Sequence, residues 1–125
     1  MPWKTNVLES PKCIEIVYLG NVTPEELYMA LKNSVLLSRE NNTILFLSDC
    51  TDMTGGHSVI DLYGLIGMFE KLNITTDAKE AIIMKSLQSS ADEIKFYETA
   101  CKNRGFNVKI FTGREDAVVW LAAQN

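Results

Sequence analysis

The residues best suited to catalysis or metal binding lie in one short stretch of the chain. Asp49, Cys50, Asp52 and His57 fall within nine positions, and His57 is the only histidine in the sequence. A cysteine nucleophile needs a nearby base and a third group that orients it, and a zinc site needs three or four ligands within reach of one another. One cysteine and one histidine in a loop meet neither requirement by spacing alone. We therefore predict no catalytic residue, no metal, no cofactor and no enzymatic activity.

The glycines beside this histidine suggest a different use. Residues 54–58 read Thr-Gly-Gly-His-Ser, and a helix is expected to start at Ser58. Glycines let backbone N–H groups approach a ligand closely, and a helix N-terminus favours anions. The segment lacks the lysine of a phosphate-binding loop and the spacing of a dinucleotide fingerprint. A phosphate or carboxylate site is thus one interpretation, and a plain turn with Ser58 as helix cap is the other.

The helix expected from residue 58 to residue 72 carries more apolar surface than one packed face requires. Leu62, Leu65, Ile66 and Phe69 account for a face against a sheet. A second face combines bulky apolar groups with two glycines, and its members are Ile60, Tyr63, Gly64, Gly67 and Met68. That combination permits close approach by another helix, a partner chain or an acyl tail. Burial within the same domain is the alternative.

These candidate residues belong to a chain in which strands and helices alternate. Strands are expected at 2–8, 12–20, 43–48, 81–84 and 106–110, and helices at 23–40, 58–72, 90–104 and from 114 onward, with a loop at 49–57. The first two strands should form an antiparallel hairpin, and the helical crossovers that follow require parallel pairing. The order ββαβαβαβα predicts an α/β fold with a single mixed, mostly parallel five-stranded sheet and four helices.

Composition narrows the classes of partner. The 125 residues suit one domain, 1–125, and the net charge of -4 disfavours nucleic acid. Cys13, Cys50 and Cys101 show no short metal-type spacing, which indicates reduced thiols and a cytoplasmic location. No apolar run approaches 18 residues, so we expect no membrane span.

Four features carry a resemblance to a known superfamily: the hairpin, the Thr-Pro-Glu-Glu helix start at 23–26, the strand that ends in Asp49, and the terminal stretch 114–121. Together they resemble the anti-sigma factor antagonist (STAS-like) superfamily, more narrowly its uncharacterised bacterial branch grouped with CRAL-TRIO-type lipid-binding domains. In phosphoregulated members, a serine at the start of the helix after the third strand is phosphorylated. The resemblance makes Ser58 the matching candidate, although residues 51–57 depart from the Ser-Ser-Gly-Leu pattern of those members.

The resemblance implies a non-enzymatic interaction module that binds a protein partner or its own copy through loop 49–58 and the following helix. The predicted binding residues are Asp49, Thr51, Thr54, Gly55, Gly56, His57, Ser58, Ile60, Tyr63, Gly64, Gly67 and Met68. The alternative, implied by the CRAL-TRIO grouping, is a carrier of a small amphiphile or lipid. An internal apolar cavity would favour the carrier, and an exposed apolar patch would favour the module.

Overall fold

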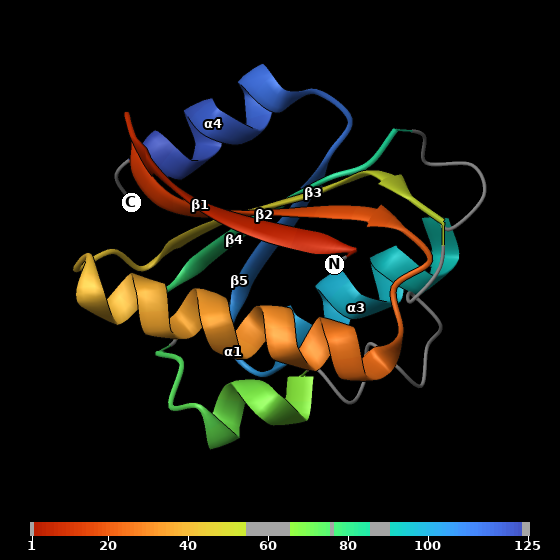
Figure 1. Cartoon of the computed structure of the whole chain (residues 1–125), viewed down its shortest axis with the longest axis horizontal. Coiled ribbons are helices and arrows are strands. Elements are labelled where there is room, and N and C mark those ends of the chain that lie inside the picture. Colours follow the sequence, from red (N-terminus) through yellow and green to blue (C-terminus); the bar gives the residue numbers. More distant parts are fainter. Residues whose placement is uncertain (1, 55–65, 76, 86–90, 124–125) are drawn as a thin grey trace.

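A computed structural model describes residues 2–54, 66–75, 77–85 and 91–123, with the backbone alone for 91–94. Five strands form one sheet: β1 (Trp3–Glu9), β2 (Lys12–Gly20), β3 (Leu45–Met53), β4 (Lys79–Ile83) and β5 (Asn107–Phe111). The helices are α1 (Pro24–Glu40), a short helix at 66–71, α3 (Ala91–Asn103) and α4 (Arg114–Ala122). Figure 1 shows α4 on one face of the sheet and the other helices on the opposite face.

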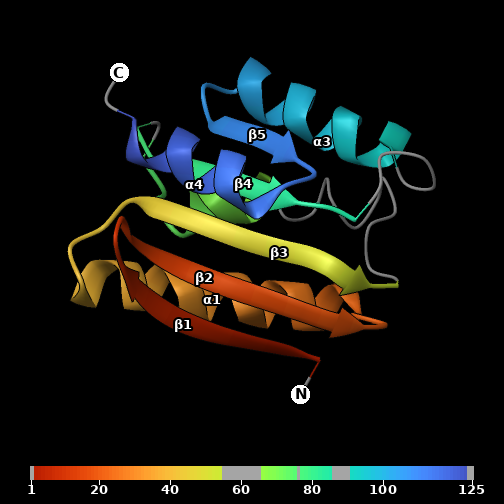
Figure 2. The same cartoon turned by 90° about the horizontal axis from the view of Figure 1, so that it is seen from above.

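The strands lie in the order β1-β2-β3-β4-β5. β1 pairs with β2 antiparallel, and the other three pairings are parallel. Figure 2 shows β1 and β5 at the two edges, with β3 between them. The predicted mixed sheet with an N-terminal hairpin is therefore confirmed, as are the interior positions of the third and fourth strands.

The start of α1 follows the predicted capping pattern. The Thr23 hydroxyl accepts a hydrogen bond from the backbone N–H of Glu26 at 3.2 Å, and the Glu26 carboxylate accepts one from the backbone N–H of Thr23 at 2.9 Å. Pro24 occupies the first turn, where its missing N–H costs nothing. At the other end, Asn42 adopts a positive φ of 53° and the Thr43 N–H bonds the Ser38 carbonyl, so the last carbonyls of the helix are satisfied. Both ends of α1 are thus fixed by local sequence.

β3 is longer than predicted, and this corrects the expected loop at 49–57. The strand continues through Asp49 to Met53 because β2 extends to Gly20 and pairs with it as far as Gly20↔Met53, across a register shift between Val17 and Leu19. The polar residues at 49–52 lack a hydrophobic period, but their backbone groups are held by the neighbouring strand. At the start of the same segment, Ile44 lies outside the strand and is exposed, which differs from the buried position expected for it.

Two apolar layers enclose the sheet. On the α4 face, a cluster joins Cys13, Leu47, Ala81, Ile83, Ala117 and Leu121. On the other face, Ile66 and Phe69 of the short helix pack with Ile82 and Tyr97, which confirms two of the four residues predicted for the packed face of the 58–72 helix.

Along β3, Leu47 and Asp49 point to the α4 face, whereas Phe46, Ser48 and Cys50 point to the other. This alternation decides which polar groups can meet.

Candidate functional site

Five of the twelve predicted binding residues lie in the part of the chain that the structure describes. Asp49 and Thr51 belong to β3, Thr54 follows it directly, and Gly67 and Met68 belong to the helical turns at 66–71. The other seven, Gly55, Gly56, His57, Ser58, Ile60, Tyr63 and Gly64, lie outside the described residues. Asp49 contacts the α4 side of the sheet, whereas the 66–71 turns pack on the opposite side. The described residues at the two ends of the predicted surface are therefore on different faces.

Asp49 and Thr51 are brought together at the end of β3. One carboxylate oxygen of Asp49 accepts hydrogen bonds from the backbone N–H of Thr51 at 3.0 Å and from its hydroxyl at 2.7 Å. The other carboxylate oxygen lies 3.7 Å from the Arg114 guanidinium at the start of α4. Asp49 thus links the end of a central strand to the start of the last helix.

Arg114 also bonds a second carboxylate, and sequence reasoning missed this pair. Its guanidinium donates to Glu15 of β2, whose side chain is almost fully buried, and the other Glu15 oxygen accepts from the Asn6 amide at 2.9 Å. A buried carboxylate is costly without such partners. The sequence does hint at a buried ion pair here, because Glu15 is the single charged residue within the apolar run 13–19.

These contacts form a network that we call the strand-end network: Asn6, Glu15, Asp49, Thr51 and Arg114. It crosses three strands and one helix on the α4 face, from the middle of β2 to the second half of β3, and the two parallel strands run on from it to their ends at Gly20 and Met53. Its groups hold one another in place, while about half of the Arg114 side chain stays exposed. The carboxylates of Glu15 and Asp49 hold the partly exposed Arg114 guanidinium in a fixed position. This arrangement suits binding of another molecule rather than catalysis.

An apolar residue lies beside the network. Leu19 is 43% exposed at the end of β2, and it pairs in register with Asp52, which is also exposed. The next residue, Gly20, has a φ of +67° and accepts a hydrogen bond from the Thr54 N–H at 2.8 Å, so the two strands stay paired up to this point. The strand ends therefore present an exposed leucine on a fixed backbone next to charged side chains.

Cys50 does not join Asp49 in a reactive cluster. Its side chain packs with the apolar residues on the α1 side of the sheet, opposite Asp49. Burial raises the pKa of the Cys50 thiol far above its usual range, and the negative charges of Glu80 and Asp49 raise it further. A neutral thiol is a poor nucleophile and a poor metal ligand. Within the described ranges, no group of three or more His, Cys, Asp or Glu side chains is placed to hold a metal ion.

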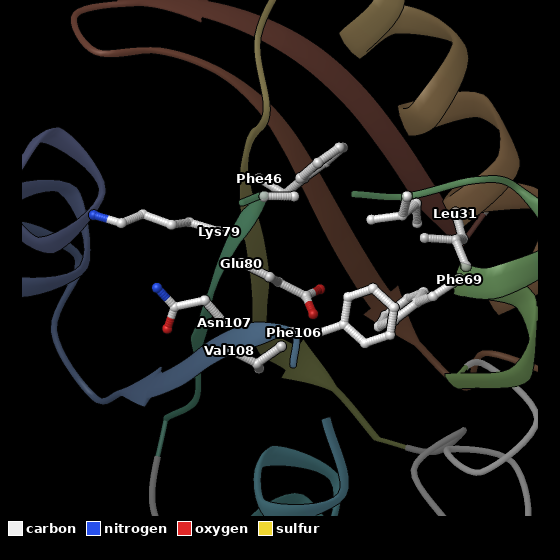
Figure 3. Close-up of a pocket in the computed structure, with 10 residues that line it drawn as sticks. Leu31, Phe46, Phe69, Lys79, Glu80, Phe106, Asn107 and Val108 are labelled. Atoms are coloured by element: carbon white, nitrogen blue, oxygen red, sulfur yellow. The ribbon is translucent and has the colours of Figure 1, made fainter. Parts of the chain in front are cut away.

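A second polar cluster that the sequence did not reveal lies inside the core (Figure 3). The two carboxyl oxygens of Glu80 accept hydrogen bonds from the Tyr97 hydroxyl and the Ser48 hydroxyl, each at 2.9 Å. Burial raises the pKa of Glu80, and the two hydrogen bonds partly oppose that rise. Glu80 also lines a cavity of about 30 Å³ whose other walls include Leu31, Phe46, Phe69, Phe106 and Val108. Such a volume holds one or two water molecules.

Comparison with known proteins identifies the fold. No family model and no curated protein matches the sequence. Among solved structures, an uncharacterised protein of the DUF3478 family with a SpoIIAA-like fold, from Shewanella loihica, is 22% identical with a TM-score of 0.57, covering 96% of this chain and 92% of its own. An anti-sigma factor antagonist from Mycobacterium paratuberculosis is 12% identical with a TM-score of 0.62, covering 97% of this chain and 95% of its own.

At these identities the likeness shows the fold. The chain has a SpoIIAA-like fold, which confirms the fold that the predicted STAS-like resemblance implies. Neither of the two solved structures is described as a lipid-binding protein, so the CRAL-TRIO part has no support. Within the described residues, no helix is long and apolar enough to cross a membrane.

Proposed function

We propose that this chain is a non-enzymatic, regulatory protein-interaction module. Its binding surface consists of the ends of β2 and β3, the strand-end network, and the predicted residues of loop 49–58, whereas Gly67 and Met68 of the following helix belong to the opposite face of the sheet and are left out of it. The observation that carries the proposal is the exposed Leu19 beside a charged network whose members are already fixed by one another. Preorganised polar groups around an exposed apolar residue are a common arrangement in protein interfaces.

The fold supports the same interpretation. One of the solved structures with this fold is an anti-sigma factor antagonist, a class of protein defined by its action on another protein. The partly buried, neutral thiol of Cys50 and its position on the face opposite Asp49 support a non-enzymatic role. Ser58 lies outside the described residues, and its phosphorylation stays a prediction.

The amphiphile carrier is the weaker of the two predicted functions. The carrier requires an internal apolar cavity, and the apolar cavity beside Glu80 measures about 30 Å³, too small for an organic ligand. The larger hollows, of about 300 and 610 Å³, are lined in part by polar and charged residues such as Arg39, Asn42 and Lys79. Leu19 is a single exposed apolar side chain rather than the patch named above, and it supports the interaction module through its place in register with the exposed Asp52. The free thiols of Cys13, Cys50 and Cys101 support a reducing, cytoplasmic location, and the net charge of -4 supports protein rather than nucleic acid as partner.

Affinity capture from an extract of the source cells tests this proposal. The immobilised protein should retain a specific partner, identified by mass spectrometry, and Leu19→Asp should reduce that capture at least about tenfold because a carboxylate would have to be desolvated in the interface. Ser58→Asp should weaken capture for the same reason.

The matched control is Val119→Asp, which introduces the same charge at a residue of α4 that is 69% exposed. It should leave capture unchanged. All three variants should melt within a few degrees of the wild type. Equal capture by wild type and Leu19→Asp would move the binding surface away from the strand ends.

A further inference from the structure

The outer face of α1 carries exposed apolar side chains that the proposed function does not use. Among the described residues, seven large apolar side chains are exposed, and three of them lie on this one helix: Tyr28, Met29 and Leu36. The sheet-facing side of α1 is formed by other residues, including Leu27, Ala30 and Val35. Residues 28, 32 and 36 follow one another at four-residue spacing, and 29 and 36 are two turns apart, so the three form one stripe.

This stripe is rigid before anything binds to it. α1 has 17 residues and is about 25 Å long, with a capping box at its start and satisfied carbonyls at its end. Thr5 on β1 donates a hydrogen bond to Asn33 of the helix at 3.1 Å, which anchors its middle to the sheet. Met29 and Leu36 are each more than half exposed. A preorganised surface of this kind loses little conformational entropy when it docks.

The charges within the stripe indicate what covers it. Glu25 and Lys32 are exposed on the same side of α1, seven residues apart. Consider a second copy of α1 that lies antiparallel to the first, with the two-fold axis passing between residues 28 and 29. The numbers of any two residues that face each other then add up to 57. Tyr28 then meets Met29 at the centre, and Glu25 meets Lys32 on both sides. A parallel arrangement would instead place Glu25 on Glu25 and Lys32 on Lys32.

We propose that two copies of this chain associate through α1, antiparallel and two-fold symmetric, with Tyr28 and Met29 at the axis and a Glu25–Lys32 ion pair on either side. A two-fold interface must be complementary to itself, and the Tyr28–Met29 and Glu25–Lys32 pairs meet that condition, while Leu36 falls opposite residue 21, at the edge of the contact. Figure 1 shows that α1 and α4 lie on opposite faces of the sheet. The pairing therefore leaves the strand-end network on the α4 face accessible in both copies.

Sedimentation equilibrium over a concentration series tests the pairing. The wild type should show a monomer–dimer equilibrium. Glu25→Lys should weaken it at least about tenfold, because it opposes two lysines at two symmetry-related positions, and Lys32→Glu should act likewise through two glutamates. The double variant Glu25→Lys with Lys32→Glu restores opposite charges at both positions, and its dissociation constant should return close to that of the wild type.

Two further variants separate the pairing from general effects. Met29→Lys should weaken the dimer at least about tenfold, and Glu9→Lys, the same charge change as Glu25→Lys at an exposed residue of β1, should leave it unchanged. Circular dichroism checks that each variant is folded. A monomeric wild type throughout the series, or a double variant as weak as the single ones, would overturn the proposal. Neither result bears on partner capture through Leu19, so the two proposals fail separately.

Discussion

Replacing Tyr97 with Phe should lower the free energy of unfolding by about 2 kcal/mol at pH 8. The Tyr97 hydroxyl donates to one oxygen of the buried Glu80 carboxyl, and hydrogen bonds to charged groups contribute about 1.5–3 kcal/mol. At this pH the carboxylate would be left with Ser48 as its remaining donor among the described residues. Urea denaturation of the wild type and the variant in the same buffer measures the difference.

Glu80→Gln should have the opposite effect. Burial raises the pKa of Glu80 from its ordinary value of 4.5, so the folded protein binds this proton more tightly than the unfolded chain does. The contribution of this group to the free energy of unfolding is therefore fully present below about pH 4.5, and it is lost as the pH rises through the pKa of Glu80 in the folded protein. The glutamine cannot ionise, so the variant should be about 1 kcal/mol more stable than the wild type at pH 8.

A pH series distinguishes this account from simple packing effects. The advantage of Glu80→Gln over the wild type should shrink as the pH falls toward 4.5, because the wild-type carboxyl becomes neutral as well. The deficit of Tyr97→Phe should shrink over the same range. If Glu80→Gln is less stable than the wild type at pH 8, or if the difference in stability does not change with pH, Glu80 is not a buried carboxyl group with a raised pKa as described here.

Leu121→Ala should lower the free energy of unfolding by about 3 kcal/mol. Leu121 is fully buried between α4 and the sheet, in the cluster with Leu47 and Ala117, and deleting such a side chain loses apolar contacts and leaves a cavity. Trp120→Ala should cost about 2 kcal/mol, because Trp120 is only half-buried, with its ring 5.7 Å from that of Phe111 and 5.0 Å from the Lys79 ammonium.

Val119→Ala provides the matched comparison on the same helix. Val119 is exposed, so its truncation should change the free energy of unfolding by less than about 0.5 kcal/mol. Denaturant midpoints of the three variants should therefore fall in the order Leu121→Ala, Trp120→Ala, Val119→Ala, with the first the lowest. A Leu121→Ala midpoint close to that of the wild type would contradict the docking of α4 described here.

The fold was predictable because its local signals agree with one another. The capping box at Thr23 set the start of α1, and the apolar run Ile44–Leu47 indicated a strand covered on both faces, which is right for Phe46 and Leu47 but wrong for the exposed Ile44. The error came at 49–53, where turn-forming residues sit in a strand. Local composition favoured a loop there, but pairing with the long β2 decided the structure.

The candidate site was less predictable because its contacts join residues far apart in the sequence. Arg114 and Glu15 are separated by 99 positions, and only the packing of α4 on the face of the sheet brings them together. Glu80 gave no signal because the predicted strand began at Ala81, one residue later than Glu80, and its partners Ser48 and Tyr97 come from β3 and α3. The contact between Asp49 and Thr51 was easier to predict from the sequence, because these residues are only two positions apart.

Hydrogen exchange of the protein with and without its captured partner tests the central claim most directly. The account predicts slower exchange on binding at residues 17–20 and 50–54, where β2 and β3 end beside the strand-end network. Backbone amides at residues 7–9 of β1, which pair with residues 12–14 at the opposite end of β2, should exchange at the same rate in both samples. Protection confined to α1 or α3, with 17–20 and 50–54 unchanged, would contradict a binding surface at the strand ends.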